Sequence, residues 1–329
     1  MSADWRQACQ FRRQAYTGGE GTRKEGSTMI LIDTHCDTLS VMAGLGGDYN
    51  APPQTITPER LRQGGVAAQI CALFAGVEGP AGNPAGLARK QLAALRCFTD
   101  EGIRHIKEFS EIRDGSPSVM LSVEGGEVFE GSLESLHEYY EAGVRMCALT
   151  WNHENELGFP HCKDSEKPLK PFGWEAVREM NRLGMAVDVS HLGTGGFWDL
   201  IEHADKPPMA SHSCCLAIQP KHTRNLSDDQ IRALVERGGW IGINFCSAFL
   251  SDERATAFNI DRNIARIADL GGIKNVGFGS DFDGIPCNPI GVDGPHQFPN
   301  LLDTLGKRFS KEEVEGIAGL NFLEYARRL

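Results

Sequence analysis

The sequence predicts an α/β protein built as a single (β/α)8 barrel of the TIM type, and two observations support this fold class. Short apolar runs rich in β-branched residues recur along the chain, and helical patterns lie between them. The apolar residues mostly follow one another without alternation, which is typical of parallel strands buried on both faces. Strands that alternate with helices over 329 residues fit an α/β barrel, which can reach this length as one domain.

The expected strands are short and similar in composition. The first is MILID at residues 29–33, where four apolar residues lead into an acid. Residues 1–28 hold mixed charges and no long apolar stretch, so we expect a peripheral N-terminal extension there and a barrel domain over 29–329. The seven strands expected after the first lie at 66–74, 118–126, 145–151, 185–190, 207–213, 239–245 and 275–282.

Helical patterns fill the intervals between the expected strands, and several end in glycine, as helices commonly do. They lie at 85–109, 133–143, 173–184, 227–239 and 260–272. The alternative to a barrel is a doubly wound open sheet, but no glycine-rich dinucleotide motif follows the first strand. A long polar loop at 152–171 follows the fourth strand, and loops of this length are often functional.

Charge and cysteine content limit the partners. The formal net charge of −11 argues against nucleic acid or an anionic membrane surface. The ten cysteines are scattered, so we expect reduced thiols rather than a disulfide framework. No apolar run approaches the roughly 18–20 residues of a membrane span, and no secretory signal is recognisable. We therefore expect a soluble, cytoplasmic protein. Its oligomeric state stays open, a homodimer included.

Polar residues gather at the carboxyl ends of the expected strands. His35 and Asp37 are two positions apart in an extended segment, so their side chains should project to the same side. In a barrel all such ends converge at one mouth, where active sites of this fold lie. Imidazoles and carboxylates that meet there form the ligand set of a hydrolytic metal centre. The polar residues at the other strand ends are Glu124, Asn152, His153, His191, His212, Asp281 and Asp283.

Each of these signals is weak when taken alone. A His-X-Asp sequence is more often incidental, Glu124 could begin a turn at the glycines that follow it, and SDFDG could be an ordinary acidic turn. Their common place at one end of the strands favours a site. The remaining histidines are expected to be solvated or locally bonded: His105, His137 and His203 in helical segments, His161 in the long loop, and His222 and His296 in polar loops.

Six motifs occur in a fixed order along the chain: IDTHCD, SVEGG, ALTWNH, VDVSH, ASHS followed by RNLSDDQ, and VGFGSDFDG. In this respect the sequence resembles the membrane dipeptidase (renal dipeptidase) family of zinc metallopeptidases, from about residue 29 to the C-terminus. The resemblance implies two Zn²⁺ ions, with Mn²⁺ or Co²⁺ as substitutes. It implies that His35 and Asp37 bind one ion, that His191 and His212 bind the other, and that Glu124 bridges both.

The same resemblance implies catalytic and substrate-binding roles. His153 matches the family histidine that contacts the substrate carbonyl oxygen, Asp281 the catalytic acid/base, and Arg224 the arginine that holds the substrate carboxylate. One position departs from the mammalian pattern, because Cys246 stands where a tyrosine lines the substrate pocket. Eukaryotic members are secreted and lipid-anchored, whereas this chain looks like a soluble bacterial-type member.

The function that these features imply is a dinuclear zinc dipeptidase that acts on short peptides, chiefly dipeptides, and tolerates a C-terminal D-residue. Its partner would be a small peptide, without nucleic acid or membrane. One alternative is a metal-dependent amidohydrolase for another amide or ester, although the bridging position is Glu124 rather than a carboxylated lysine. Another is a non-catalytic metal-binding protein, which would have no need for both His153 and Asp281.

Overall fold

The structure is a computed structural model that describes residues 29–44, 54–74, 76 and 83–329. The expected extension at 1–28 lies outside the described residues. Within them, all strands belong to one sheet. The strands are β1 (Leu31–Asp33), β2 (Val66–Phe74), β3 (Arg104–His105), β4 (Ser118–Glu124), β5 (Val144–Ala148), β6 (Ala186–Asp188), β7 (Met209–Ala210), β8 (Trp240–Ile243) and β9 (Val276–Phe278).

The sheet closes into an eight-stranded parallel barrel, which confirms the predicted fold class. The strand order is β2-β1-β9-β8-β7-β6-β5-β4-β3, and an additional pairing of β2 with β4 closes the ring. The short β3 is not part of the ring. It pairs with the first residues of β4, and β5 joins β4 only from Leu121 onward.

All eight expected strands are present, but most are shorter than predicted at their carboxyl ends. The strand expected at 207–213 is reduced to Met209–Ala210, and the one expected at 275–282 ends at Phe278. The residues that follow these strands bond to side chains of neighbouring strands instead of continuing the ladder; Asp33, for example, accepts a hydrogen bond from the backbone N–H of Ser280. The polar strand ends therefore belong to the loops that build the mouth.

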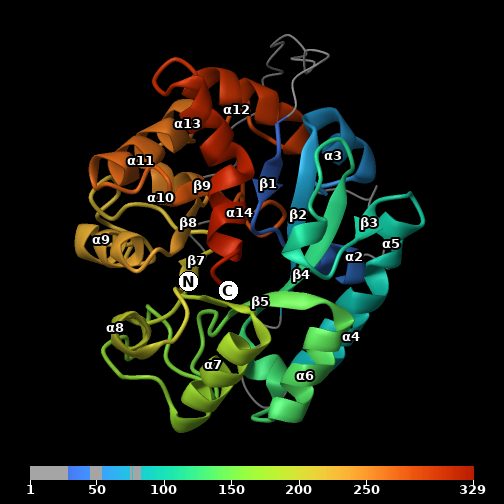
Figure 1. Cartoon of the computed structure of the whole chain (residues 1–329), viewed down its shortest axis with the longest axis vertical. Helices are drawn as coiled ribbons and strands as arrows, with labels where there is room; N and C mark the ends of the chain where they lie inside the picture. The colour runs from blue at the N-terminus through green and yellow to red at the C-terminus, as the bar shows by residue number, and fades with distance from the viewer. Residues whose placement is uncertain (1–28, 45–53, 75, 77–82) are drawn as a thin grey trace.

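Helices surround the barrel, as Figure 1 shows. The α-helices are α2 (Thr38–Gly44), α3 (Pro58–Gly64), α4 (Pro84–Ala94), α5 (Arg96–Thr99), α6 (Leu133–Ala142), α7 (Pro171–Leu183), α8 (Thr194–His203), α9 (Asp228–Glu236), α10 (Ser247–Leu250), α11 (Ala257–Asp269), α12 (Phe298–Leu305), α13 (Lys311–Glu315) and α14 (Asn321–Ala326). The 3-10 helices are η1 (Phe109–Glu111), η2 (Gly126–Phe129) and η3 (Pro295–Gln297), and η4 (Gly316–Leu320) is a π-helical segment.

The helix expected at 85–109 is wrong beyond residue 99. The helical segments α4 and α5 end there, and Gly102 adopts a φ of +77°, a left-handed conformation that glycine takes at little cost. The backbone N–H of Ile103 returns to the carbonyl of Phe98, and the chain then enters β3. His105 therefore lies in a strand and not in a helix.

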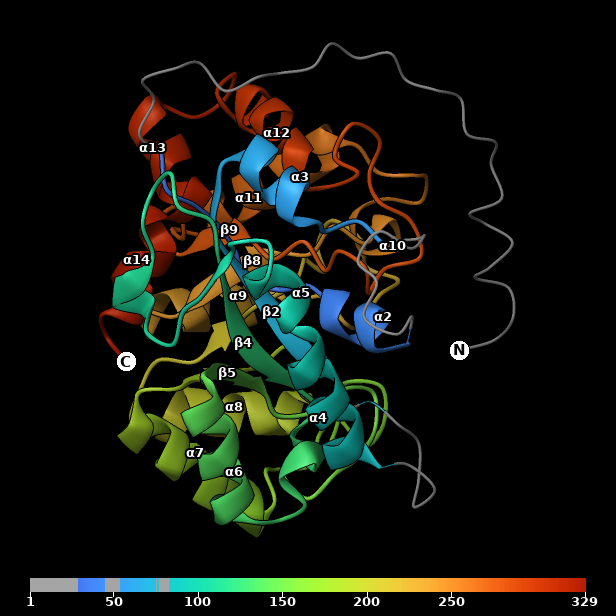
Figure 2. The ribbon, with the colours of Figure 1, turned by 90° about the vertical axis from the view of Figure 1, so that its right-hand side faces the viewer.

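The amino end of the barrel is filled by apolar side chains. Trp240, the first residue of β8, packs with Phe322 and Tyr325 of α14, and the Tyr325 hydroxyl donates to the carbonyl of Pro207. In Figure 2, α14 lies on one side of the strands, whereas α2 and α10, which follow the carboxyl ends of β1 and β8, lie on the other. Because α14 covers the amino end, the carboxyl end is left for a site, as is usual for this fold. Among the described residues, no helix is long and apolar enough to cross a membrane.

Candidate metal centre

Two of the predicted site residues have an unusual backbone. His191, after β6, and Asp281, after β9, have φ values of +66° and +61°. Residues other than glycine rarely adopt this conformation, and it persists where surrounding contacts fix it. Here the carbonyl of His191 accepts from the backbone N–H of His161 at 2.8 Å, and the backbone N–H of Asp281 donates to the carbonyl of His35 at 3.1 Å. These bonds hold the turns from which both side chains enter the mouth.

Glu124, at the carboxyl end of β4, presents one oxygen to a pair of imidazoles. Its Oε1 lies 3.1 Å from Nε2 of His191 and 3.3 Å from Nε2 of His212. The two Nε2 atoms are 3.1 Å apart. Tetrahedral zinc with ligand bonds of about 2.0–2.1 Å separates its ligand atoms by about 3.3 Å. These three atoms are therefore spaced as ligands of one ion would be.

The other oxygen of Glu124 faces a second group. Its Oε2 lies 3.6 Å from Nε2 of His35, which in turn is 3.9 Å from Oδ2 of Asp37 and 3.7 Å from Oδ1 of Asp281. The rings of His35 and His212 stack at 3.7 Å, so the two groups are neighbours. One carboxylate thus stands between two sets of potential ligands.

Burial and charge also suit cations at this place. Burial opposes a charge on Glu124, but His35, His191 and His212 bring its pKa well below the usual range. Burial lowers the pKa of His35, but the carboxylates, Glu124 above all, raise it to about 10. His35 Nε2 and Asp37 Oδ1 are both buried and have no hydrogen-bond partner among the described residues. Orphaned polar atoms of this kind are uncommon in proteins and fit a role in coordination.

The histidines near Glu124 are oriented through their Nδ1 atoms. Nδ1 of His191 lies 3.0 Å from Oδ1 of Asn152, and Nδ1 of His212 lies 2.7 Å from Oγ of Ser211. Burial lowers the pKa of His191 to about 4 and that of His212 well below its usual value, so both rings are neutral near pH 7. Asn152, expected at a strand end, therefore orients a potential ligand.

Asp281 is held on the side away from His35. The amide of Asn244, after β8, donates to its Oδ2 at 2.8 Å and accepts from the backbone N–H of Cys246 at 2.7 Å. Burial raises the pKa of Asp281 to about 6. A carboxyl group in this position can exchange a proton near neutral pH. Asn244 was not among the predicted site residues, although it lies at the same end of its strand as the others.

Asp283, also expected at a strand end, does not join this cluster. Its carboxylate accepts from the hydroxyl of Thr38 and from the backbone N–H of Thr55, both at 2.6 Å. Asp283 therefore connects the loop after β9 to two segments that follow the first strand. The following residue, Gly284, lies against the cluster, because a Cβ atom there would be 2.5 Å from Oδ1 of Asp281.

Arg224 is a buried cation beside the cluster. Its side chain donates to the hydroxyl of Ser213 at 2.8 Å and to the carbonyl of His212 at 2.9 Å, and its Nε has no hydrogen-bond partner in the part of the chain that the structure describes. Only 6% of the residue is exposed. No carboxylate of the described residues forms an ion pair with it. A buried guanidinium with neutral partners can hold an anionic group next to the metal ligands.

Two further histidines, His153 and His161, lie near the cluster. The ring of His153 contacts that of Trp151 at 5.2 Å, and Trp151 lies 6.3 Å from His191, so Trp151 connects His153 to the cluster. His161 was expected to be an ordinary loop histidine. Its ring lies 6.1 Å from that of His191, and its Nδ1 lies 3.4 Å from the hydroxyl of Thr223. Burial lowers its pKa to about 3. The only sequence signal for His161 was the length of its loop.

Two buried aspartates support the cluster and were missed by the sequence analysis. Asp33, at the end of β1, accepts from the backbone N–H of Ser280 at 2.7 Å and from its hydroxyl. Asp188, at the end of β6, bonds Ser211 in the same way. Each of these serines directly precedes a member of the cluster on the neighbouring strand. In the sequence, both aspartates could have been recognised as acids that end an apolar strand.

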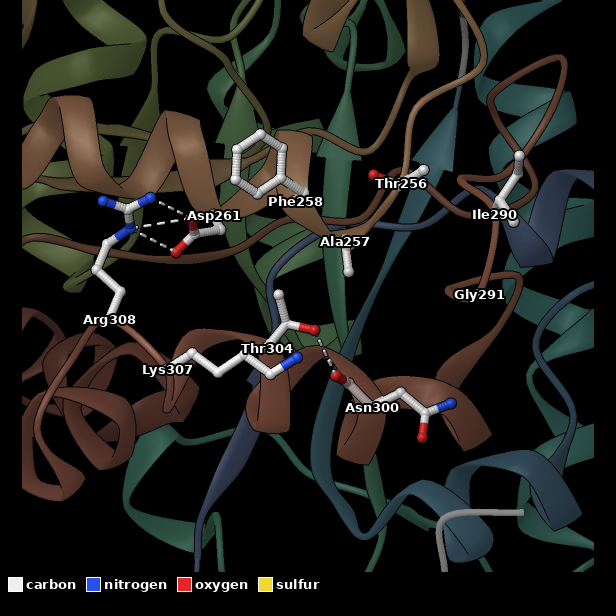
Figure 3. A pocket seen from close by; sticks show the side chains of 10 residues that line it. All are labelled: Thr256, Ala257, Phe258, Asp261, Ile290, Gly291, Asn300, Thr304, Lys307 and Arg308. Carbon is white, nitrogen blue, oxygen red and sulfur yellow. Dashed lines mark hydrogen bonds and ion pairs between the residues drawn. The ribbon is translucent and has the colours of Figure 1, made fainter. Parts of the chain in front are cut away.

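A hollow of about 820 Å³ lies elsewhere, between α11, α12 and the segment around Ile290 (Figure 3). Phe258 and Ile290, which are 56% and 42% exposed, line it. Its buried carboxylate, Asp261, is paired with Arg308 at 2.8 Å. None of its lining residues belongs to the cluster around Glu124, so this hollow is separate from the candidate metal centre.

Comparisons with known proteins identify sequence relatives of this chain. An uncharacterized dipeptidase of Schizosaccharomyces pombe is 34% identical over 224 residues, which is 64% of this chain and 52% of the relative. This chain thus spans about half the length of that relative. An uncharacterized protein in the pqqA 5′ region of Klebsiella pneumoniae is 32% identical over 247 residues, which is 68% of this chain and 89% of that protein.

A solved structure shows the same fold. It is a metallopeptidase of Rhodobacter sphaeroides bound to a phosphinate mimic of the dipeptide L-Ala-D-Ala, with a TM-score of 0.83 and 23% identity. The superposition covers 92% of this chain and 99% of the other. The family model described as membrane dipeptidase (peptidase family M19) matches residues 24–328. This match confirms the resemblance of the six motifs, and the chain belongs to the membrane dipeptidase family, peptidase family M19.

Proposed function

We propose that this protein is a dinuclear zinc dipeptidase. The observation that carries the proposal is the position of Glu124, whose two carboxylate oxygens face two separate sets of potential ligands. In this assignment His35 and Asp37 hold one ion, His191 and His212 hold the other, and Glu124 bridges them. Imidazole and carboxylate ligands suit zinc, and they also accept Mn²⁺ or Co²⁺.

Arg224 gives the proposed site its preference for short peptides. Its guanidinium is bonded to the carbonyl of His212 and so lies beside a proposed ligand. It is buried and lacks an anionic partner among the described residues, and the C-terminal carboxylate of a peptide would supply one. With the terminus bound at Arg224, the peptide bond one residue away would lie over the metal centre. The substrate would therefore be a dipeptide.

The chain's own side chains would move the protons. Bound metal ions polarise the scissile carbonyl and lower the pKa of a water molecule. Asp281, held by Asn244, would take a proton from the attacking water and deliver it to the leaving amine. His153 would donate a hydrogen bond to the oxygen that becomes negative during attack.

The C-terminal residue of the substrate is proposed to be less restricted in configuration. The Rhodobacter sphaeroides metallopeptidase was crystallised with a mimic of L-Ala-D-Ala. Its similar fold supports acceptance of a C-terminal D-residue by this chain as well. Cys246, whose backbone N–H is bonded to Asn244, stands close to the proposed acid/base and gives the pocket a small, weakly polar side chain.

Metal analysis combined with a substrate panel tests the proposal. We expect close to two zinc equivalents per chain, hydrolysis of L-Ala-L-Ala and L-Ala-D-Ala, and poor turnover of the amidated dipeptide and of a tetrapeptide. Turnover of a cyclic amide or a lactone without dipeptide hydrolysis would favour the amidohydrolase alternative. Zinc binding without turnover of any of these substrates would favour a non-catalytic metal-binding protein.

A further inference from the structure

Asp188 and Ser211 form a buried pair behind the candidate metal centre. Oδ1 of Asp188 accepts from the backbone N–H groups of Ser190 and Ser211 at 2.8 and 2.9 Å. Its Oδ2 accepts from the hydroxyl of Ser211. Asp188 is 3% exposed, and these three donors satisfy its carboxylate. An ionised carboxylate can only accept hydrogen bonds, so the single hydroxyl hydrogen of Ser211 points to Asp188.

Because the Ser211 hydroxyl donates to Asp188, the direction of the hydrogen bond between Ser211 and His212 is also determined. Oγ of Ser211 lies 2.7 Å from Nδ1 of His212. Since the hydroxyl hydrogen is already donated to Asp188, Oγ must accept the hydrogen bond from His212, and Nδ1 must carry the imidazole proton. The nearby Ser190 does not change this result, because its hydroxyl accepts from the backbone N–H of His212 at 3.2 Å and keeps its own hydrogen for Ser211, at 3.4 Å.

A neutral His212 with its proton on Nδ1 has a lone pair on Nε2. That atom faces two further acceptors, Oε1 of Glu124 at 3.3 Å and Nε2 of His191 at 3.1 Å. His191 is oriented in the same sense, since its Nδ1 lies 3.0 Å from Oδ1 of Asn152. Three lone pairs that converge at such distances repel one another unless a cation lies between them.

We infer that Asp188 and Ser211 are positioning residues that keep the proton of His212 on Nδ1 and thereby present Nε2 to the metal ion. This inference rests on the proposed function for the presence of the metal centre. Neither residue touches the ion or the substrate. Ser211 alone would not suffice, because a free hydroxyl could rotate and donate to Nδ1, which would leave the proton on Nε2. Asp188 prevents this rotation.

Two variants separate the members of the pair. Asp188→Asn offers an amide N–H to Ser211 and releases the hydroxyl hydrogen towards Nδ1, so it favours the wrong tautomer. Ser211→Ala removes the acceptor for Nδ1–H. Ser118→Ala is the matched control, since it also removes a buried strand hydroxyl, which donates to the carbonyl of Ala67 at 2.7 Å, but at the amino end of β4. Circular dichroism and thermal unfolding check that each variant is folded.

The first readout is zinc affinity, measured on the full chain by competition with a chromophoric chelator. We expect one of the two zinc equivalents to bind about 10- to 100-fold more weakly in Asp188→Asn and Ser211→Ala, the usual effect of losing such a support. The other equivalent should keep its affinity, and Ser118→Ala should match the wild type. Folded variants with unchanged affinity for both equivalents would overturn the inference.

The second readout does not depend on the stability of Asp188→Asn or Ser211→Ala. In the zinc-loaded wild type labelled with ¹⁵N-histidine, long-range proton–nitrogen spectra identify which ring nitrogen carries a proton. The His212 signals are assigned by their loss in His212→Gln. A proton on Nδ1 of His212 supports the inference, and a proton on Nε2 overturns it.

Dipeptide hydrolysis by the wild type is measured separately. Weakened zinc binding in Asp188→Asn together with an inactive wild type would support the positioning role and overturn the proposed function. An active wild type with unaltered zinc binding in both variants would support the proposed function and overturn the positioning role.

Discussion

Gly284 leaves the space that the carboxylate of Asp37 occupies: a Cβ atom at Gly284 would lie 1.9 Å from Oδ2 of Asp37. Side chains of real residues do not approach so closely, so any other residue would displace the carboxylate. Gly284 therefore ties the loop after β9 to the proposed ligand after β1. Gly284 and Asp37 are almost 250 positions apart in the sequence.

Gly284→Ala should remove part of the metal. We expect loss of about one zinc equivalent and a decrease in kcat/KM of about 10-fold or more, because Asp37 and its neighbour Asp281 must both move. Gly44→Ala, at the end of α2, is the control, since a Cβ atom there would meet none of the described residues within 4 Å. Normal zinc content and rate in Gly284→Ala would show that Asp37 is not a ligand.

Glu124→Gln should lose both ions and all activity, because one negative charge serves two metals. Zinc content by mass spectrometry measures the first effect and dipeptide turnover the second. Glu127→Gln is a suitable control, as Glu127 is three residues away and bonds to the amide of Asn155 at 2.9 Å. Two zinc equivalents retained in Glu124→Gln would contradict the bridging role.

Asp281→Asn should separate proton transfer from metal binding. We expect kcat to fall by roughly 10²-fold or more, the usual contribution of general acid/base catalysis, with zinc content unchanged. Steady-state kinetics and metal analysis on the same preparation check both parts. If one zinc equivalent disappears with the rate, Asp281 is a ligand, which its distance of 3.7 Å from His35 Nε2 would then explain.

The pH dependence of kcat should report the ionisation of Asp281. Burial raises its pKa to about 6, and the hydrogen bond from Asn244 opposes this effect. A general base acts in its ionised form, so kcat should fall as the pH decreases through this pKa. Bound metal cations stabilise the ionised carboxylate, so the acidic limb of the kcat profile should lie below pH 6. Asn244→Ala removes a donor to the ionised form and should shift the limb to higher pH.

Asn275→Ala is the control for this profile, because its amide donates to the carbonyl of Gly239 before β8 begins, at the opposite end of the strand. The control should keep the wild-type limb. An unshifted limb in Asn244→Ala would mean that another group titrates.

Arg224→Ala should raise KM far more than it lowers kcat, if the anchor acts equally in the ground and transition states. A charge-assisted pair contributes about 1.5–3 kcal/mol, which corresponds to roughly 10- to 100-fold in KM. The amidated dipeptide lacks the carboxylate, so the substitution should have little effect on its turnover. An equal loss for the amide would assign Arg224 to the support of His212, whose carbonyl it bonds.

The sequence by itself determined the barrel and the residues that meet at its mouth. Continuous apolar runs separated by helical patterns are sufficient for a parallel sheet, since burial on both faces requires them. The carboxyl ends of such strands converge, so His35, Glu124, His191 and His212 could be grouped without coordinates. Local periodicity supplies this information because each run needs only its own residues to indicate a buried strand, whereas the exact carboxyl end of most strands depends on contacts with neighbouring strands.

Only the tertiary structure decided which polar residues face one another across strands. Asp281 and Asp283 are two positions apart, yet one lies beside His35 and the other bonds Thr38 and Thr55, because both have left-handed backbones that no strand periodicity describes. The pairing of Asp188 with Ser211 likewise depends on the register of β6 against β7. Such contacts arise from the packing of distant segments, and the pattern of any one segment does not contain them.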